Sequence, residues 1–184
     1  NGIDTKIFYP HRPDKKIKQR YGIDNDFICS YVGTIGMACG LEVVLDAAQI
    51  LKNKNGNNIK FLLVGSGALK EKLQRQVYQK KLDNVTFAGR QDKKRIPEFL
   101  SITDACLVHL RKTDLFKTVM PSKIFEAAAM AKPIILGVEG SAAELVRQAK
   151  AGICIKPQNA EQLVQALEKL AANPSLRNEF GQSA

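Results

Sequence analysis

The sequence has little of what metal sites and disulfide frameworks need. Its 184 residues include only four cysteines and two histidines: Cys29, Cys39, Cys106, Cys154, His11 and His109. No two cysteines form a Cys-x-x-Cys pair and the histidines form no cluster, so neither a metal site nor a set of disulfides is expected. Three of the cysteines fall in predicted strands, where a free thiol behaves as a small apolar group. We therefore expect no metal and a reducing, cytoplasmic setting.

Long hydrophobic runs are also missing. No apolar stretch approaches the roughly 20 residues that a membrane-spanning helix needs, and the polar opening has no secretory signal pattern. The chain does not begin with methionine, so we expect it to be part of a longer protein. Its length suits one domain and is short for two. A hydrophobic content of 45% and a charged content of 25% are ordinary for a soluble protein.

The net charge of +10 favours an acidic partner, either a nucleotide phosphate, an anionic lipid or a nucleic acid. Arginines do not alternate with aromatic residues as they do in proteins that bind single strands, so a nucleic acid is the weakest of the three. Basic patches at 15–20 and 93–95 would suit an anionic membrane surface. Solvated helix faces are the more common reason for such patches.

Six short apolar runs alternate with helical patterns, with no internal repeat. The runs predict strands at 27–32, 59–64, 85–87, 104–110, 134–138 and 152–155. Helices are predicted at 41–51, 69–77, 93–100, from Pro121 to Pro133, from 144 to about 150, at 160–172, and from 174 to the end, where the last helix is cut short. The segment 1–28 begins as an irregular lead-in with a basic patch, and 111–119 reads as a long polar loop. This order predicts one doubly wound, parallel six-stranded α/β sheet, whose ligands bind at the carboxyl ends of the strands.

The most informative stretch is Thr118–Glu126, which reads TVMPSKIFE. Pro121 suits the first turn of a helix, because its missing N–H is not needed there. Free N–H groups beside Ser122 and Lys123 make an anion site. One turn further on, the Glu126 carboxylate can accept hydrogen bonds from a diol such as a ribose. An anion site beside a diol site indicates a nucleotide, although a surface glutamate paired with lysine fits the spacing equally well.

The segment from Pro121 through AAAMAKPI resembles the signature of the family 4 retaining glycosyltransferases, which have two Rossmann-like domains (the GT-B architecture). Two further segments, NGID from Asn1 and GTIGMACGLE from Gly33, are similar to sequences in the bacterial branch of this family that contains the N-acetylfucosaminyl- and colanic-acid-type transferases. The resemblance implies that 1–184 is the C-terminal half, which binds a nucleotide-sugar donor (UDP is the expected carrier). The N-terminal acceptor domain would be absent. It also implies synthesis of surface polysaccharide from a glycan or lipid-linked acceptor at the inner face of a bacterial membrane, without a cofactor or metal.

The same resemblance assigns roles to individual residues. Glu126 would bind the ribose, Lys123 and Thr118 would lie at the reaction centre, and Ala88–Gln91 would frame the base. The expected nucleotide-binding residues are Gly33, Thr34, Gly36, Gly65, Gly67, Arg90, Gln91, Val119, Met120, Pro121, Ser122, Lys123 and Glu126.

Three positions depart from the family pattern. Thr118 stands where the family usually has a second glutamate, and Thr34 and Cys39 stand where it commonly has an arginine and a lysine. The charge on the diphosphate would then be met by backbone amides and Lys123, with Arg90 and Arg111 in reserve.

Other classes remain open on the sequence alone. Half of a nonhydrolysing UDP-sugar 2-epimerase shares the fold and the nucleotide. A nicotinamide-binding domain would need Gly-x-Gly-x-x-Gly after the first strand, and the spacing of Gly33, Gly36 and Gly40 does not fit. A non-catalytic nucleotide-binding module or a pure interaction module is also compatible. His109, at the end of a predicted strand, reads as a packing residue more readily than as an acid or base.

Overall fold

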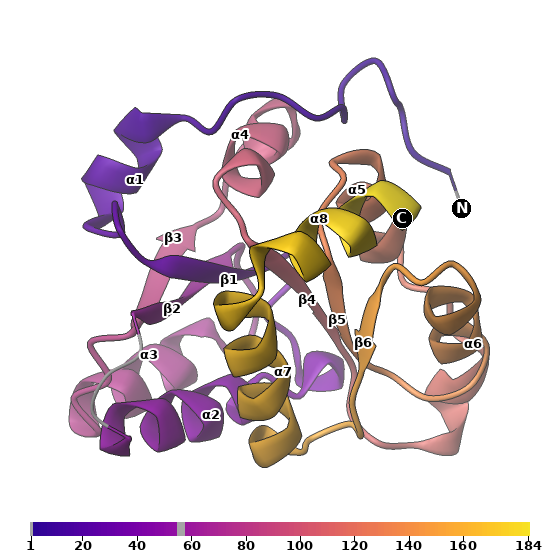
Figure 1. Cartoon of the computed structure of the whole chain (residues 1–184). Helices are drawn as coiled ribbons and strands as arrows, with labels where there is room; N and C mark the ends of the chain where they lie inside the picture. The colour runs from indigo at the N-terminus through magenta and orange to yellow at the C-terminus, as the bar shows by residue number, and fades with distance from the viewer. Residues whose placement is uncertain (1, 55–57) are drawn as a thin grey trace.

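The computed structural model describes residues 2–54 and 58–184 and confirms the predicted doubly wound sheet (Figure 1). The six strands are all parallel and lie in the order β3-β2-β1-β4-β5-β6. Their bounds are β1 Phe27–Val32, β2 Ile59–Val64, β3 Val85–Gly89, β4 Ala105–His109, β5 Ile134–Gly137 and β6 Gly152–Cys154. Each strand agrees with its predicted run to within two residues at either end. The sequence Asn1–Asp4, which carries part of the family resemblance, is described from Gly2 on; Asn1 lies outside the described residues.

Helices cover both faces of the sheet, and each face has its own core. One core holds α2 (Glu42–Asn53), α3 (Lys70–Gln79), α7 (Ala160–Ala172) and α8 (Pro174–Ser183). The other holds α1 (Lys15–Tyr21), α4 (Ile96–Ser101), α5 (Lys123–Ala129) and α6 (Ser141–Gln148). Successive residues of a strand point to opposite faces, so β1 sends Tyr31 into the first core and Ile28 into the second. This two-sided burial explains why the strands read as continuous apolar runs.

The lead-in is more regular than the sequence predicted, because α1 forms within it. Asp14 caps the helix by accepting a hydrogen bond from the Lys16 amide (2.8 Å), and Gly22 ends it in the left-handed conformation. Only Ile17 is buried among its residues. One buried residue gives no apolar stripe, so the sequence pattern did not indicate the helix, although both of its end signals are present in the sequence.

The expectation that Pro133 ends the central helix is wrong. α5 stops at Ala129, and Ala131, which lies inside the predicted helix, has φ of 50°. The Lys132 amide bonds back to the Ala127 carbonyl (3.0 Å), which closes the helix end. Proline still has a part in this, because the residue before a proline is disfavoured in the helical region.

Two other segments differ from the prediction in detail. The polar loop 111–119 contains a 3-10 helix, η3 (Asp114–Thr118), whose first turn is capped by the Thr113 hydroxyl. The predicted helix 93–100 is divided into a 3-10 turn, η2 (Lys93–Arg95), and α4. Pro97 lies in the first turn of α4, where its missing N–H costs no hydrogen bond.

Candidate nucleotide site

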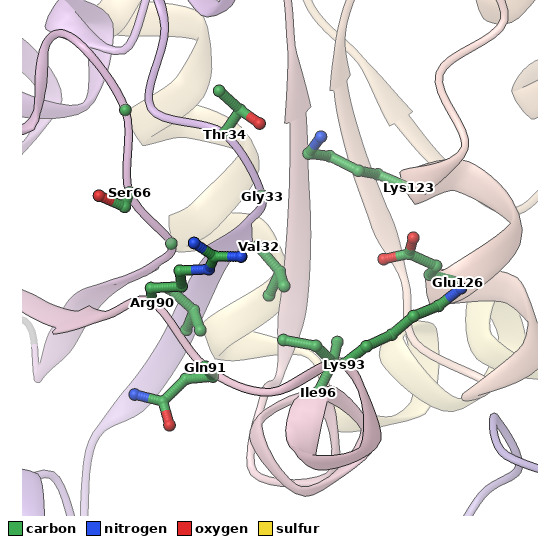
Figure 2. Close-up of a pocket in the computed structure, with 13 residues that line it drawn as sticks. Val32, Gly33, Thr34, Ser66, Arg90, Gln91, Lys93, Ile96, Lys123 and Glu126 are labelled. Carbon is green, nitrogen blue, oxygen red and sulfur yellow. The ribbon is translucent and has the colours of Figure 1, made fainter.

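A cavity of about 600 Å³ opens at the carboxyl ends of β1, β2 and β3, facing α5 (Figure 2). It brings together most of the predicted nucleotide-binding residues: Gly33, Thr34, Gly65, Gly67, Arg90, Gln91, Lys123 and Glu126. The sequence did not single out five further lining residues, Val32, Val64, Ser66, Lys93 and Ile96. Val32 and Val64 end strands and Ser66 lies between two glycines that follow β2, so the predicted fold could have placed these three at the site. The place of Lys93 depends on how the segment after β3 turns.

Two glycines make one wall of this cavity from bare backbone. Gly33 has φ of +142° and Gly65 has φ of +147°, a region that other residues rarely adopt. A Cβ at Gly65 would overlap the carbonyl oxygen of Gly33, so the turns after β1 and β2 are in backbone contact. The Gly33 amide also donates to the Val64 carbonyl (2.8 Å). The result is a side-chain-free wall of the kind that lets a ligand approach main-chain groups.

Lys123, the first residue of α5, brings a positive charge to that wall. Its ammonium nitrogen lies 5.3 Å from the centre of the Tyr31 ring, a cation–π contact. A Cβ on Gly33 would lie only 2.5 Å from the same nitrogen. The ammonium therefore occupies space that exists because residue 33 is glycine.

Glu126 lies one turn further along α5 and also lines the cavity. Burial raises the pKa of its carboxyl group, while the charges of Lys123 and Lys93 lower it in part. Figure 2 shows the Lys93 side chain extending toward Glu126 from η2, on the other side of the cavity. The site thus holds a partly desolvated carboxylate acceptor beside cations from two separate elements.

The residues that replace the family's expected cations serve the loop itself. The Tyr31 hydroxyl donates to the Thr34 carbonyl oxygen (2.8 Å). The Cys39 sulfur lies 3.0 Å from that hydroxyl and 3.2 Å from the same carbonyl. Burial raises the pKa of Tyr31, so its phenol is neutral. We define residues 33–40 as the glycine loop; this cluster fixes the path of the loop without adding charge to it.

The two reserve arginines have different surroundings. Arg90 is exposed and lines the cavity from the end of β3. Arg111 lies outside the lining and pairs with Glu42 (2.9 Å), at the start of α2. Arg90 is therefore the reserve cation that can reach a ligand in this cavity.

The segment before α5 does not line the cavity. Thr118 is exposed at the end of η3, and Val119, Met120, Pro121 and Ser122 follow it outside the lining, as does Gly36 in the glycine loop. Ser122 is the residue before α5, but its side chain makes no capping hydrogen bond. The helix has seven residues, so Lys123 and Glu126 are what it contributes to the cavity wall.

Within residues 2–54 and 58–184, no three His, Cys, Asp or Glu side chains gather as metal ligands would. All four cysteines are free thiols. No helix in the same ranges is both long and apolar enough to cross a membrane.

Comparison with protein families gives a match over residues 13–184 to the model described as glycosyl transferases group 1. The chain is 25% identical over 170 residues to alpha-D-kanosaminyltransferase of Streptomyces kanamyceticus, covering 92% of this chain and 42% of that protein. It is 29% identical over 164 residues to O-antigen chain mannosyltransferase C of Escherichia coli, covering 88% and 41%. The chain thus spans about two fifths of the length of these curated relatives.

Solved structures show the same fold. Anabaena HepE in complex with UDP and glucose superposes with a TM-score of 0.82 at 20% identity, over 100% of this chain and 49% of that one. The C-terminal domain of the glycosyl transferase group 1 family protein LpcC from Francisella tularensis gives 0.79 at 22% identity, over 99% and 94%.

Proposed function

The chain belongs to the group 1 glycosyltransferases, and on that premise we propose that it is the C-terminal, donor-binding domain of a family 4 retaining glycosyltransferase. Its donor is a UDP-sugar, and its product is a cell-surface polysaccharide. The length of the relatives supports the domain assignment, because the chain spans about two fifths of them and nearly all of an isolated C-terminal domain. The name of one relative, O-antigen chain mannosyltransferase C, supports the product class.

One observation carries the proposal: Lys123 and Glu126 lie one turn apart in a cavity that faces a backbone wall at Gly33. A diphosphate against the wall would meet the Lys123 ammonium, and a ribose beside it would meet the Glu126 carboxylate. The cavity volume of about 600 Å³ is within the range of small-ligand sites. Ala88–Gln91, the segment that ends at the cavity, would then lie along the base.

In transfer, the bond between the sugar's anomeric carbon and the diphosphate oxygen breaks, and a bond from that carbon to the acceptor oxygen forms. The proton of the acceptor hydroxyl leaves with the diphosphate. Negative charge grows on the leaving diphosphate, where the preorganised Lys123 ammonium and main-chain N–H groups stabilise it. Thr118 has a hydroxyl instead of the family's second carboxylate, so it does not offer an anion to the positive sugar. On this proposal Lys123 supplies the charge that a metal would otherwise bring. The acceptor comes from the N-terminal domain, and the chain alone should show no transfer from a labelled donor.

We place the whole enzyme in the cytoplasm, where it would work on a glycan or lipid-linked acceptor at the inner membrane face. The two basic segments, α1 and η2, meet around Phe99: its ring lies 6.2 Å from Tyr21, and the Arg95 guanidinium carbon lies 5.9 Å from its centre. Sedimentation with anionic and with neutral vesicles tests this contact. Equal binding to both would remove the electrostatic argument.

Calorimetric titration with UDP, GDP, uridine and NADH tests the proposal. We expect UDP to bind, and Glu126→Ala to weaken UDP by about 1.5–3 kcal/mol, the scale of a charged hydrogen bond. Glu144→Ala, a change on the exposed surface of α6, is the matched control and should leave the affinity unchanged. Binding of NADH in place of UDP would indicate a nicotinamide domain, and binding of none of them an interaction module. With the full-length enzyme and a labelled donor, a 2-epimerised sugar would indicate the epimerase.

A further inference from the structure

His109, the last residue of β4, is buried with both ring nitrogens engaged. Its exposed fraction is 2%. Nε2 accepts a hydrogen bond from the Gln158 amide (2.8 Å), so this nitrogen carries no proton. Nδ1 lies 2.7 Å from the Cys39 carbonyl oxygen and must be the donor in that bond. The two contacts together define one neutral tautomer.

The surroundings of the ring are shaped to it. A Cβ at Gly137 on β5 would overlap the ring carbon Cδ2, and a Cβ at Gly40 would lie 3.2 Å from Cε1. The imidazole therefore lies between two glycine backbones, and its position is closely restricted. A side chain held so tightly can fix the groups to which it bonds.

The group held by Nδ1 belongs to the wall of the nucleotide cavity. Cys39 lies in the glycine loop, and its thiol lies 3.2 Å from the carbonyl of Thr34, which lines the cavity. The Ala38 carbonyl also accepts from the Arg111 amide (2.8 Å), two residues after His109. The end of β4 thus holds the far side of the glycine loop at two adjacent carbonyls.

We propose that His109 is the positioning residue of the glycine loop: as a neutral imidazole it ties the Cys39 carbonyl to the Gln158 amide and so holds Gly33 and Thr34 in place for the donor diphosphate. This inference rests on the proposed nucleotide site. His109 itself does not line the cavity, so it acts through the loop and is not a catalytic residue.

The neutral state is essential to this role. A proton on Nε2 would set that N–H against the N–H of Gln158, and one of the two contacts would be lost. Burial lowers the pKa of His109, and the Cys39 carbonyl and Glu42 raise it in part. Of the charged groups nearby, Glu42 on α2 pairs with Arg111, while Gly137 and Gln158 contribute no charged side chain. The contact should therefore open only in acid.

Three measurements test the proposal: the imidazole ¹⁵N shifts of His109 in the unmodified chain, amide exchange at Ile35, Cys39 and Gln158, and UDP affinity across pH 8 to 5. The variants are His109→Leu, which removes both bonds, and His109→Asn, whose amide nitrogen can replace Nδ1. His11→Asn is the control, because the His11 ring contacts the Arg12 carbonyl and the Tyr9 ring in the N-terminal segment, outside the glycine loop.

At neutral pH, we expect the ¹⁵N shifts of His109 to be those of a protonated Nδ1 and an unprotonated Nε2. His109→Leu should speed amide exchange at the three positions by about tenfold or more and weaken UDP affinity by a similar factor. Exchange within α7 should stay unchanged. His109→Asn should recover most of the UDP affinity. Both His109 variants should lose the part of the pH dependence of UDP binding that comes from His109, whereas His11→Asn should retain it.

A protonated Nε2 at neutral pH would overturn the proposal, as would unchanged exchange at Ile35 and Cys39 in a folded His109→Leu chain. If that variant does not fold, the ¹⁵N shifts and the His109→Asn exchange rates decide. If the unmodified chain fails to bind UDP, the proposed function fails, and the exchange rates still decide whether His109 holds the loop.

Discussion

Replacing Lys123 with methionine should separate the charge of this side chain from its packing. Methionine retains an unbranched apolar stem over Tyr31 but removes the ammonium that lies against Gly33. Two unit charges about 4 Å apart attract by about 4 kcal/mol at an effective dielectric constant near 20. Lost hydration of the ammonium offsets part of this, so we expect UDP affinity to fall by about 2–3 kcal/mol, the net scale of charged hydrogen bonds. That is a loss of about 30- to 150-fold.

The assay is calorimetry with UDP and with uridine at about 0.05 M and 0.5 M salt. Lys123→Met should leave uridine binding nearly unchanged and flatten the salt dependence for UDP, because only the diphosphate is charged. Lys156→Met, at an exposed lysine after β6, is the control for general charge. Thermal unfolding should shift little, since a cation–π contact contributes about 0.5–1 kcal/mol. If Lys123→Met binds UDP normally and Arg90→Met does not, the phosphate lies on the β3 side and our reasoning is wrong.

Three further predictions concern the stability of the protein without nucleotide. Because burial raises the pKa of Glu126, its ionisation costs folding energy, so the free energy of unfolding should fall as the pH rises from about 4.5 through the raised pKa; Glu126→Gln should remove that slope in pH-dependent urea unfolding, and an equal slope in both chains would contradict this. Gly65→Ala should lower the free energy of unfolding in urea by about 3 kcal/mol, because a Cβ there overlaps the Gly33 carbonyl. Gly36→Ala is the control: its Cβ would lie 3.6 Å from the Thr34 methyl group, so the free energy should change by less than about 1 kcal/mol. Lys150→Gly should stabilise by up to about 1 kcal/mol, because residue 150 is exposed with φ of 51°; a lower midpoint of thermal unfolding would show that the lysine is not strained.

The sheet could be predicted from the sequence because two-sided burial leaves a plain signal. The run 59–64 is apolar except at Lys60 and is followed by a glycine, so its type and its place in the order were readable. The helix α1 was not, since one buried residue, Ile17, gives no stripe. The stop of α5 at Ala129 depends on Ala131 adopting a positive φ, which no local rule requires of an alanine.

The site was predictable where its residues follow strands or share a helix turn. Gly33, Gly65, Lys123 and Glu126 are of this kind. Lys93 reaches the cavity from η2, and its place depends on how β3 and α4 are joined. Cys39 presents the converse case: its position suggested a missing cation, and only the packed loop shows its thiol beside Tyr31.

The middle of the sheet joins two blocks of chain. The first runs from β1 through β3 and the second from β4 through β6. Strands β1 and β4 are paired at two positions, Cys29 with Ala105 and Ser30 with Cys106. By contrast, β1 and β2 pair over their full length. The cavity spans this narrow joint, since Gly33 and Gly65 come from the first block and Lys123 and Glu126 from the second. On the proposed function, a bound nucleotide would bridge the two blocks where the strand pairing is shortest. Because it would bind only the folded chain, it would stabilise the native state by mass action. Neither block, made as a separate peptide, would hold a complete site, so nucleotide binding by a mixture of the two would report their correct reassembly.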